Sequence, residues 1–486
     1  MIMSQEQAFL KSQQQLQSVL DFIEQSASDG QRIDLVEREL FSQLLAIGLT
    51  LLNGFVGSHG DGDAGEQVEV GQQQLRRMAQ PHPRRYLSIF GELSICRVVY
   101  AVREGQKIQH APLDQQLGLP AGEFSYVLED WLQRLCVKES FTEAVTSLKS
   151  ILGIASSQRA AEVMNQKMAR QSEPFQLQQA PPPSEEEGEI LVVTSDGKGV
   201  PMRRPLEQKI RDGQSPHGTK ERAGKKQMAY VGGVYSIDRF RRTADDVVDD
   251  LRRHERAADR PQPQHKQVWA EMTSDEEGIV ANGRERTFIK LAVACHTRDP
   301  QRDKPLVCLL DGERALWQMA GEWLPRAVGV LDLFHVLERL WLVAWCVHAK
   351  GSIEAQAFVD HRLRMLLEGK VGYVIGGLRR LAVEHNLRGE KLKTVNAAIT
   401  YYDNNREHMR YNEYLAAGYP IGSGVAEGAC RHLVKDRLEG TGMRWTVCGA
   451  QAMLALRSIH LNGQWDDYVN FRIQTEQNRL YWQTAA

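Results

Sequence analysis

Three carboxylates at near-equal intervals are the residues of this 486-residue chain whose types and positions could do chemistry. Asp196 ends the apolar run ILVVTSD, Asp311 ends VCLLD, and Glu427 lies in a later segment with helical spacing. In an open α/β sheet, ligands bind at the carboxyl ends of the strands. Carboxylates that converge repel one another unless a divalent cation offsets their charge. The three acids therefore predict a Mg²⁺-dependent phosphoryl-transfer site, in which Mn²⁺ could substitute.

Each acid also has a structural interpretation. An aspartate that closes a strand commonly makes a turn or caps the next helix, and this alternative stays open for Asp196 and Asp311 taken singly. Helical spacing predicts that Glu427 shares a face with Arg431, Val434 and Leu438, and so points with an apolar stripe toward the sheet. A carboxylate aimed at a core needs a metal or a partner, and a local ion pair with Arg431 is the competing interpretation.

A second polar pair lies where a strand is expected to run into a helix. Asp332 and His335 form a D-x-x-H pattern there. The pair could sit near a scissile phosphate, or His335 could be a core histidine held by Asp332. Trp445 could stack on a flipped base, although a core position is the more common role of such a residue.

Basic residues are concentrated in one stretch. The net charge of −2 does not indicate a nucleic-acid binder, but residues 203–226 carry a local excess of lysine and arginine. Such a block could follow a phosphate backbone, and a solvated loop is the alternative. The DNA-binding candidates in and near the catalytic segment are Lys198, Arg203, Arg204, Arg431 and Trp445.

The elements that must position these residues follow from the hydrophobic pattern. We predict a mainly helical N-terminal domain over 1–170, with a hairpin around Gly91, and a Pro/Glu-rich linker over 171–189. Strands are predicted at 190–195, 229–237, 287–295, 305–311 and 327–332, and alternate with helices, which indicates an α/β sheet with some parallel pairing. The catalytic core is then expected at 190–340 and 418–465, interrupted by a helical insertion at 341–417, and a tail is expected at 466–486.

Two helices near the end of the N-terminal domain could bind DNA. The segment 141–170 has the order helix, glycine-containing turn, serine cap, helix, which is compatible with a helix-turn-helix. In that interpretation the groove would be read by Gln158, Arg159, Asn165 and Lys167. An ordinary packed helical hairpin is the alternative.

Composition and missing motifs exclude several classes of protein. The apolar fraction of 42% and charged fraction of 25% are those of a globular protein of two or more domains. The seven cysteines contain no CxxC pair, and the chain has no GxxxxGK[ST], GxSxG or HExxH motif. The polar N-terminus and the short apolar stretch Leu340–Ala349 lead us to expect a cytoplasmic protein without a membrane partner.

A set of motifs across residues 86–459 resembles the ISKra-type insertion-sequence transposases, which are bacterial DDE transposases. The motifs are YLSIFGELSICRVVY, VVTSDGKGVPM, VCLLDGERALW, VLDLFHVLERLW and YPIGSGVAEGACRHLVKDRLEGTGMRWTVCGAQAMLALRSI. The resemblance implies a ribonuclease-H-like mixed sheet interrupted by an all-α insertion. It also implies that Asp196, Asp311 and Glu427 are the metal-binding triad and that Asp332 and His335 are the D-x-x-H pair of such families.

The resemblance further implies a mechanism and partners. Two Mg²⁺ ions about 4 Å apart would be held by the carboxylates and would activate a water, and then a DNA 3′-hydroxyl, for in-line attack at phosphorus. The partners would be double-stranded DNA, as terminal inverted repeats bound by the N-terminal domain and as target, and a second copy of the chain. A nuclease of the same fold that only hydrolyses, a catalytically inert DNA-binding regulator and, more remotely, a metal-independent glycosidase remain alternatives.

Overall fold

The computed structural model describes residues 4–203, 226–252, 260–276, 279–422 and 424–482. The chain forms two compact units, one comprising Met1–Phe175 and Gln464–Ala486 and the other Gln176–Gly463. The boundary after residue 175 lies inside the segment 171–189 that we predicted as a linker. Arg204, which we predicted to bind DNA, and most of the basic stretch lie outside the described residues.

The first unit begins with an antiparallel helical pair, α1 (Gln5–Ser28) and α2 (Ile33–Gly57). A small three-stranded sheet and a separate hairpin of two strands follow, and this hairpin turns at Gly91, whose φ of 131° favours glycine. The hairpin was expected from the sequence. The strands are β1 (Gln67–Val70), β2 (Gln73–Arg77), β3 (His82–Ser88), β4 (Gly91–Arg97) and β5 (Tyr100–Ala101).

Helices complete the first unit, and the last of them replaces a predicted tail. We expected 466–486 to be a tail, whereas α20 (Trp465–Gln477) buries Trp465, Tyr468, Val469, Arg472 and Glu476 at helical spacing. Arg472 forms a buried ion pair of 2.7 Å with Glu129, which ties α20 to α4. The other helices are α3 (Pro112–Gln116), α4 (Tyr126–Cys136), α5 (Phe141–Leu152), α6 (Gln158–Ala169) and α7 (Ser172–Leu177), which crosses the boundary.

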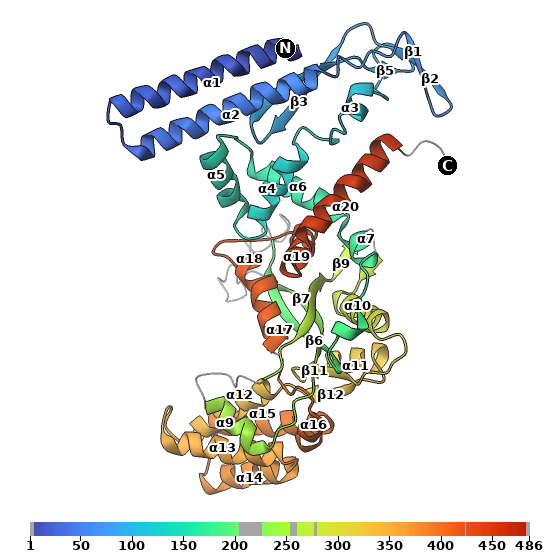
Figure 1. The fold of residues 1–486 in the computed structure, drawn as a ribbon. Helices are drawn as coiled ribbons and strands as arrows, with labels where there is room; N and C mark the ends of the chain where they lie inside the picture. The colour runs from blue at the N-terminus through green and yellow to red at the C-terminus, as the bar shows by residue number, and fades with distance from the viewer. Residues whose placement is uncertain (1–3, 204–225, 253–259, 277–278, 423, 483–486) are drawn as a thin grey trace, which may run out of the picture. The chain divides into compact units, whose positions relative to one another are not determined.

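The second unit is built on a mixed five-stranded sheet with the order β12-β11-β6-β7-β8 (Figure 1). The pairs β12–β11 and β11–β6 are parallel, while β6–β7 and β7–β8 are antiparallel. The mixed α/β class that the sequence predicts is therefore correct. The strands are β6 (Ile190–Pro201), β7 (Lys226–Ile237), β8 (Gln264–Met272), β11 (Leu306–Leu310) and β12 (Val328–Leu331). A short hairpin, β9 (Ser274–Glu276) and β10 (Ile279–Ala281), follows β8.

Alternate residues of β6 serve two cores, as the two-residue period of a strand requires. Leu191 and Val193 pack with α10 (Gly283–Arg298) and α11 (Arg314–Trp323). Ile190 and Val192 belong to the larger cluster on the other face, which the helical block shares. Asp196 is an even-numbered residue of β6, like Ile190 and Val192, and therefore lies on the face of the larger cluster, together with α17 (Gly424–Ala429).

One strand prediction is wrong. Residues 287–295 form part of α10 rather than a strand, and Asn282 caps this helix by accepting hydrogen bonds from the backbone N–H groups of Arg284 and Glu285. A short apolar run fits either a strand or a buried helix, and here the buried residues recur at helical spacing. The strand β8, whose first half is polar, was missed.

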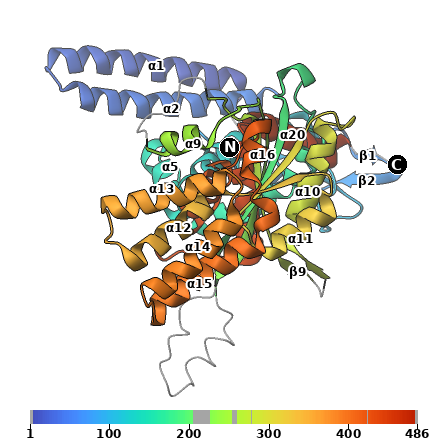
Figure 2. The same cartoon turned by 90° about the horizontal axis from the view of Figure 1, so that it is seen from below.

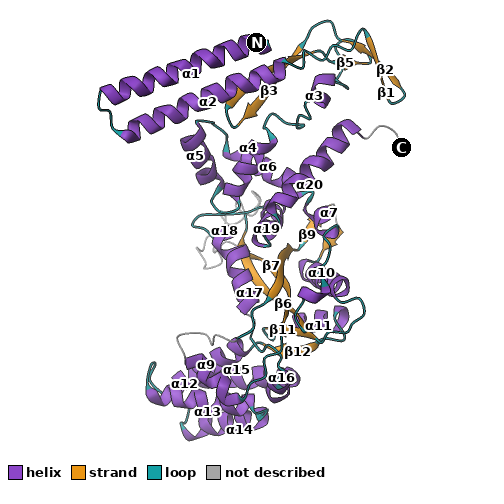
Figure 3. Ribbon diagram, in the orientation of Figure 1, coloured by secondary structure: helices purple, strands orange, loops and turns teal. Residues whose placement is uncertain are grey.

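Helices separate β12 from α17 in the chain, as we expected from residues 341–417. Figures 2 and 3 show these helices gathered in one block. They pack around one apolar cluster that is continuous with one face of the sheet. The block consists of α12 (Leu333–Val347), α13 (Ile353–Leu367), α14 (Val371–Glu384), α15 (Gly389–Asn404) and α16 (Tyr411–Ala417), with α9 (Ala244–Arg252) beside α13. After α17 come a π-helical segment (Cys430–Lys435), α18 (Asp436–Leu438) and α19 (Val447–Leu461).

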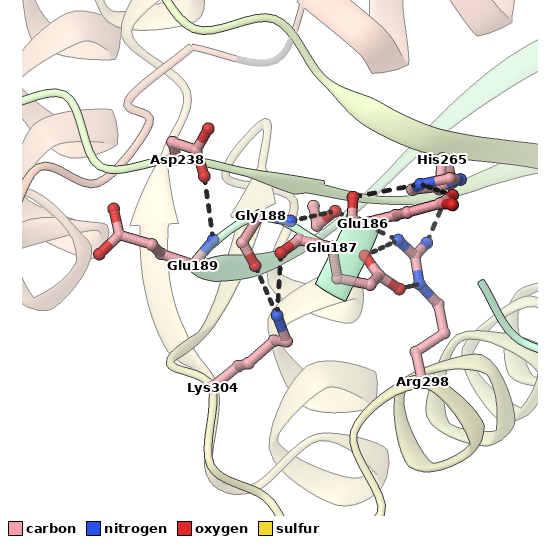
Figure 4. A network of polar contacts seen from close by, with 9 residues as sticks. Glu186, Glu187, Gly188, Glu189, Asp238, His265, Arg298 and Lys304 are labelled. Atoms are coloured by element: carbon pink, nitrogen blue, oxygen red, sulfur yellow. Dashed lines mark hydrogen bonds and ion pairs between the residues drawn. The ribbon is translucent and has the colours of Figure 1, made fainter. Parts of the chain in front are cut away.

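The acidic end of the predicted linker is fixed to the second unit (Figure 4). Glu187 forms an ion pair with Arg298, and both side chains are at most 3% exposed. Lys304 donates to the backbone carbonyl oxygens of Glu187 and Gly188. These contacts secure the residues just before β6, so residues 187–189 belong to the core that carries Asp196.

Candidate metal and catalytic centre

Strand register places three aspartates side by side. Ser195 of β6 pairs with Leu310 of β11, and Leu310 pairs with Leu331 of β12. The residues that directly follow these three are Asp196, Asp311 and Asp332, respectively. Because neighbouring strands lie about 4.8 Å apart, these residues form a row at the carboxyl end of the parallel part of the sheet. The sequence predicted this location for the first two.

Asp196 is held from two directions. Its Oδ1 accepts a hydrogen bond of 2.6 Å from the N–H of Gly197, and its Oδ2 accepts one of 3.2 Å from the thiol of Cys430. Burial raises the pKa of Asp196 and the charge of Asp311 adds to this rise, while the two hydrogen bonds and His335 act against it. Burial also raises the pKa of the Cys430 thiol, which therefore stays protonated as a donor. Because β6 continues to Pro201, Asp196 lies inside a strand rather than at its end.

The turn after β11 fixes Asp311. Gly312 has a φ of 91°, and a Cβ there would lie 2.9 Å from Leu331 and 3.0 Å from Tyr401, so the close approach requires glycine. The hydroxyl of Tyr401 donates to the backbone carbonyl of Asp311 at 2.7 Å. The Asp311 carboxylate accepts from the N–H of Glu313 at 2.9 Å, which closes a turn, and its charge acts on the neighbouring Asp196.

Asp332 is buried and begins α12. Its Oδ1 accepts a hydrogen bond of 2.8 Å from the N–H of Phe334, which makes it the N-cap, and its own N–H donates to Leu310. His335 lies one turn along α12 and is about one-third exposed. His335 is therefore not the buried core histidine of the structural interpretation, and the catalytic interpretation of the pair stays a prediction.

Glu427 reaches the same place from α17. Ligand atoms of Asp332, His335 and Glu427 all lie within 4.8 Å of one another. Partial burial and the charges of Asp332 and Asp196 raise the pKa of Glu427, although its side chain reaches solvent, and His335 lowers it. Two carboxylates whose pKa values are raised partly by other carboxylates indicate concentrated negative charge, which is the condition under which protein oxygens bind a divalent cation.

The predicted helical face around Glu427 is partly wrong. Val434 and Leu438 are buried, but Glu427 and Arg431 are exposed to solvent, because the π-helical segment interrupts the regular spacing between them. Arg431 lies 3.9 Å from Asp436, a surface contact instead of the predicted local pair with Glu427. The Arg431 side chain is 72% exposed, and its predicted contact with DNA stays a prediction.

Three other DNA-binding candidates, Lys198, Trp445 and Arg203, differ in exposure. Lys198 lies on β6, close enough for its charge to lower the pKa of Cys430. Trp445 is buried, its indole N–H donates to the carbonyl of Leu438 at 3.0 Å, and Arg437 stacks on its ring. Trp445 is therefore a core residue rather than a base-stacking one. Arg203 is exposed and its N–H bonds to the carbonyl of Trp445.

The helices α5 and α6 form where the sequence predicted them, but their polar residues do not all face solvent. Asn165 is buried and donates to Gln133 at 2.9 Å, so it cannot read a groove. Lys167 pairs with Glu476 at 3.1 Å. Gln158 and Arg159 are exposed at the start of α6, where Arg159 makes only a long contact of 3.6 Å with Glu162.

Cys430 and Tyr401 are the residues of this site that sequence reasoning missed. Each touches an aspartate from an element far away in the chain, and neither has a local signal. Cys430 stands three residues after Glu427, which at helical spacing was the one available hint.

Comparison with known proteins gives a weak structural similarity. The sequence matches no protein-family model and no curated protein. Among solved structures, it is similar to the Drosophila P element transposase strand transfer complex, at 8% identity and a TM-score of 0.24, over 74% of this chain and 84% of that chain. A TM-score of this size decides neither fold nor function.

Proposed function

We propose that this protein is a DDE-type DNA transposase with a ribonuclease-H-like catalytic core, and that Asp196, Asp311 and Glu427 are its metal ligands. The observation that carries the proposal is that ligand atoms of Asp332, His335 and Glu427 lie within 4.8 Å of one another, beside the row in which strand register places Asp196 and Asp311. The mixed sheet and the helical block before α17 support the proposed core. The partner would be double-stranded DNA.

The donor set fits Mg²⁺, with Mn²⁺ as a substitute, because hard divalent cations prefer carboxylate oxygens. Mg²⁺ would offset the clustered charge and polarise a phosphate oxygen. The residues of the chain supply the rest. Cys430 and Gly197 orient Asp196, Tyr401 and Gly312 set the turn of Asp311, and Asp332 fixes His335 beside Glu427.

The test is incubation of the purified chain with supercoiled plasmid DNA. We expect nicking in Mg²⁺ or Mn²⁺ that EDTA stops, and joining of a linear duplex with free 3′-hydroxyl ends to the plasmid. Nicking without joining would favour a nuclease that only hydrolyses. DNA binding without any nicking would favour the inert regulator.

Divalent cations should stabilise the fold. The pKa values of Asp196 and Glu427 are raised, so ionising these two acids in the folded state lowers the free energy of unfolding. This destabilisation is absent below the pKa of the unfolded chain and develops as pH rises through the pKa of the folded protein. A bound cation offsets the destabilisation, and at a hundred times Kd adds about 2.7 kcal/mol. Differential scanning fluorimetry should show a Tm rise of roughly 5 °C at slightly alkaline pH.

The same rise should shrink as the solution is acidified, because protons compete with the cation for these carboxylates. Asp196→Asn should abolish it at every pH. A Tm rise of equal size in that variant would place the cation elsewhere.

Arg159 provides a test of the helix-turn-helix interpretation. Arg159→Ala should weaken binding to a mixed-sequence duplex and reduce the salt slope by about one, as expected for a lost phosphate contact. Fluorescence anisotropy at several salt concentrations measures both. The control is Lys149→Ala, which removes an exposed lysine of α5. If Arg159→Ala binds DNA as well as the wild type does, α5 and α6 form an ordinary packed helical hairpin.

A further inference from the structure

The helical pair α1–α2 packs in an unusual way. Where α1 faces α2, it presents the small residues Ala8, Ser12 and Ser26 together with Val19. Ala8 meets Gly54 of α2 so closely that a Cβ added at Gly54 would lie 2.5 Å from it. The two helices therefore approach through small side chains, and most of their large apolar side chains point elsewhere.

Those large side chains form one stripe on each helix. On α1 they are Phe9, Leu16, Leu20 and Ile23, and on α2 they are Ile33, Phe41, Leu44, Leu51 and Phe55. Each stripe stays on one side of its helix because its residues follow helical spacing. Successive residues of the stripe are seven, four and three positions apart on α1, and three, seven and four positions apart from Phe41 on α2. All nine are exposed, by 37% to 84%.

Both stripes lie on the same side of the pair. On α1, Phe9 and Leu20 each follow a residue that faces α2, namely Ala8 and Val19. On α2, Leu51 and Phe55 each follow a buried residue, Thr50 and Gly54. One residue step turns a helix by about 100° in a fixed sense. Because the helices are antiparallel, this turn brings both stripes to one face, here called the hairpin face.

We propose that the hairpin face is a homodimer interface, at which two copies of α1–α2 pack as a four-helix bundle. The same face on each copy provides the self-complementary surface that a two-fold interface needs. At roughly 90 Å² of exposed surface for each half-buried Leu, Ile or Phe, the nine side chains offer on the order of 800 Å². A stable dimer buries about 800 Å² per partner.

The observations favour a second copy over a lipid bilayer. By length and composition α2 could cross a membrane. However, its other flank packs on β4, where Leu52 and Val56 contact the cluster of Leu93, and α1 lies beside it with Gln13 and Gln14. A bilayer would have to accept those amides and the strand, whereas a bundle needs only one apolar face.

Analytical ultracentrifugation of the full chain without DNA tests this inference, which goes beyond the proposed function. We expect a dimer, at twice the 55.0 kDa chain mass, for the wild type. The double variant Leu20→Glu/Leu51→Glu should raise the dimer Kd by at least ~100-fold, because four carboxylates would be buried without partners. Circular dichroism should be unchanged, since both side chains are already exposed in the single chain.

A matched control uses exposed leucines that lie off the hairpin face. Leu10 and Leu35 are 59% and 52% exposed on the same helices, and Leu10→Glu/Leu35→Glu should leave the dimer intact. A monomeric wild type, a dimer that survives Leu20→Glu/Leu51→Glu, or equal loss in the control would overturn the proposal. A monomer that floats with phosphatidylglycerol vesicles in a flotation assay would also overturn it, because the hairpin face would then bind lipid.

Discussion

Replacing Asp196 by asparagine is expected to lower Mg²⁺-dependent nicking of supercoiled DNA by at least ~10³-fold while duplex binding persists. The substitution preserves shape, and the amide oxygen can still accept one of the two hydrogen bonds, from Gly197 or from Cys430. It removes one of the charges that the proposed cation needs. Agarose-gel nicking assays under single-turnover conditions measure the rate, and anisotropy measures binding.

The melting temperature of the Asp196→Asn variant distinguishes a lost metal ligand from a lost structural contact. The raised pKa of Asp196 means that its ionised form is disfavoured in the folded protein, so without metal the variant should melt at the wild-type temperature or slightly above it. Asp311→Asn and Glu427→Gln should lose nicking in the same way. The matched control is Asp403→Asn on α15, where a surface carboxylate pairs with Arg406 at 2.8 Å and nicking should be unchanged. Loss of DNA binding in all three site variants would argue for a structural role instead.

The largest effect on folding is expected at Arg298. Arg298→Met leaves the carboxylate of Glu187 buried without its partner, and breaking a buried pair in this way costs about 3–5 kcal/mol. Chemical denaturation followed by circular dichroism measures the loss in the free energy of unfolding. Arg406→Met, which breaks the exposed pair with Asp403, should cost less than ~1 kcal/mol.

The pH dependence gives a second readout for the same pair. Burial acts to raise the pKa of Glu187, but the hydrogen bonds from Arg298 and Ser236 and the charges of Arg298 and Lys304 outweigh it, so the pKa lies below its ordinary value of 4.5. The stabilisation is therefore present above pH 4.5 and is lost as pH falls through the lowered pKa. Wild type and Arg298→Met should converge in acid. The double variant Glu187→Met/Arg298→Met should recover much of the loss at neutral pH, and a double variant as unstable as the single one would contradict the pair as the cause.

Sequence patterns located much of the site because they report local periodicity. A run of apolar residues ending in aspartate identified β6 and β11, and both aspartates lie at the carboxyl end of the parallel strands. Helical spacing identified α17 but not the direction of Glu427, because the π-helical segment shifts the spacing between Glu427 and Val434. An inserted residue of this kind has no local signature in a single sequence.

The sequence by itself determined the mixed α/β class, the helical block between β12 and α17, and the positions of Asp196, Asp311 and Asp332 at strand ends or just beyond the parallel pairing. Only the tertiary structure decided that Cys430 bonds Asp196, that Glu187 pairs with Arg298, and that Trp445 and Asn165 are buried. Periodicity depends on the backbone geometry of a few successive residues, whereas these contacts depend on which distant segments pack together, and that is set by the free energy of the whole fold.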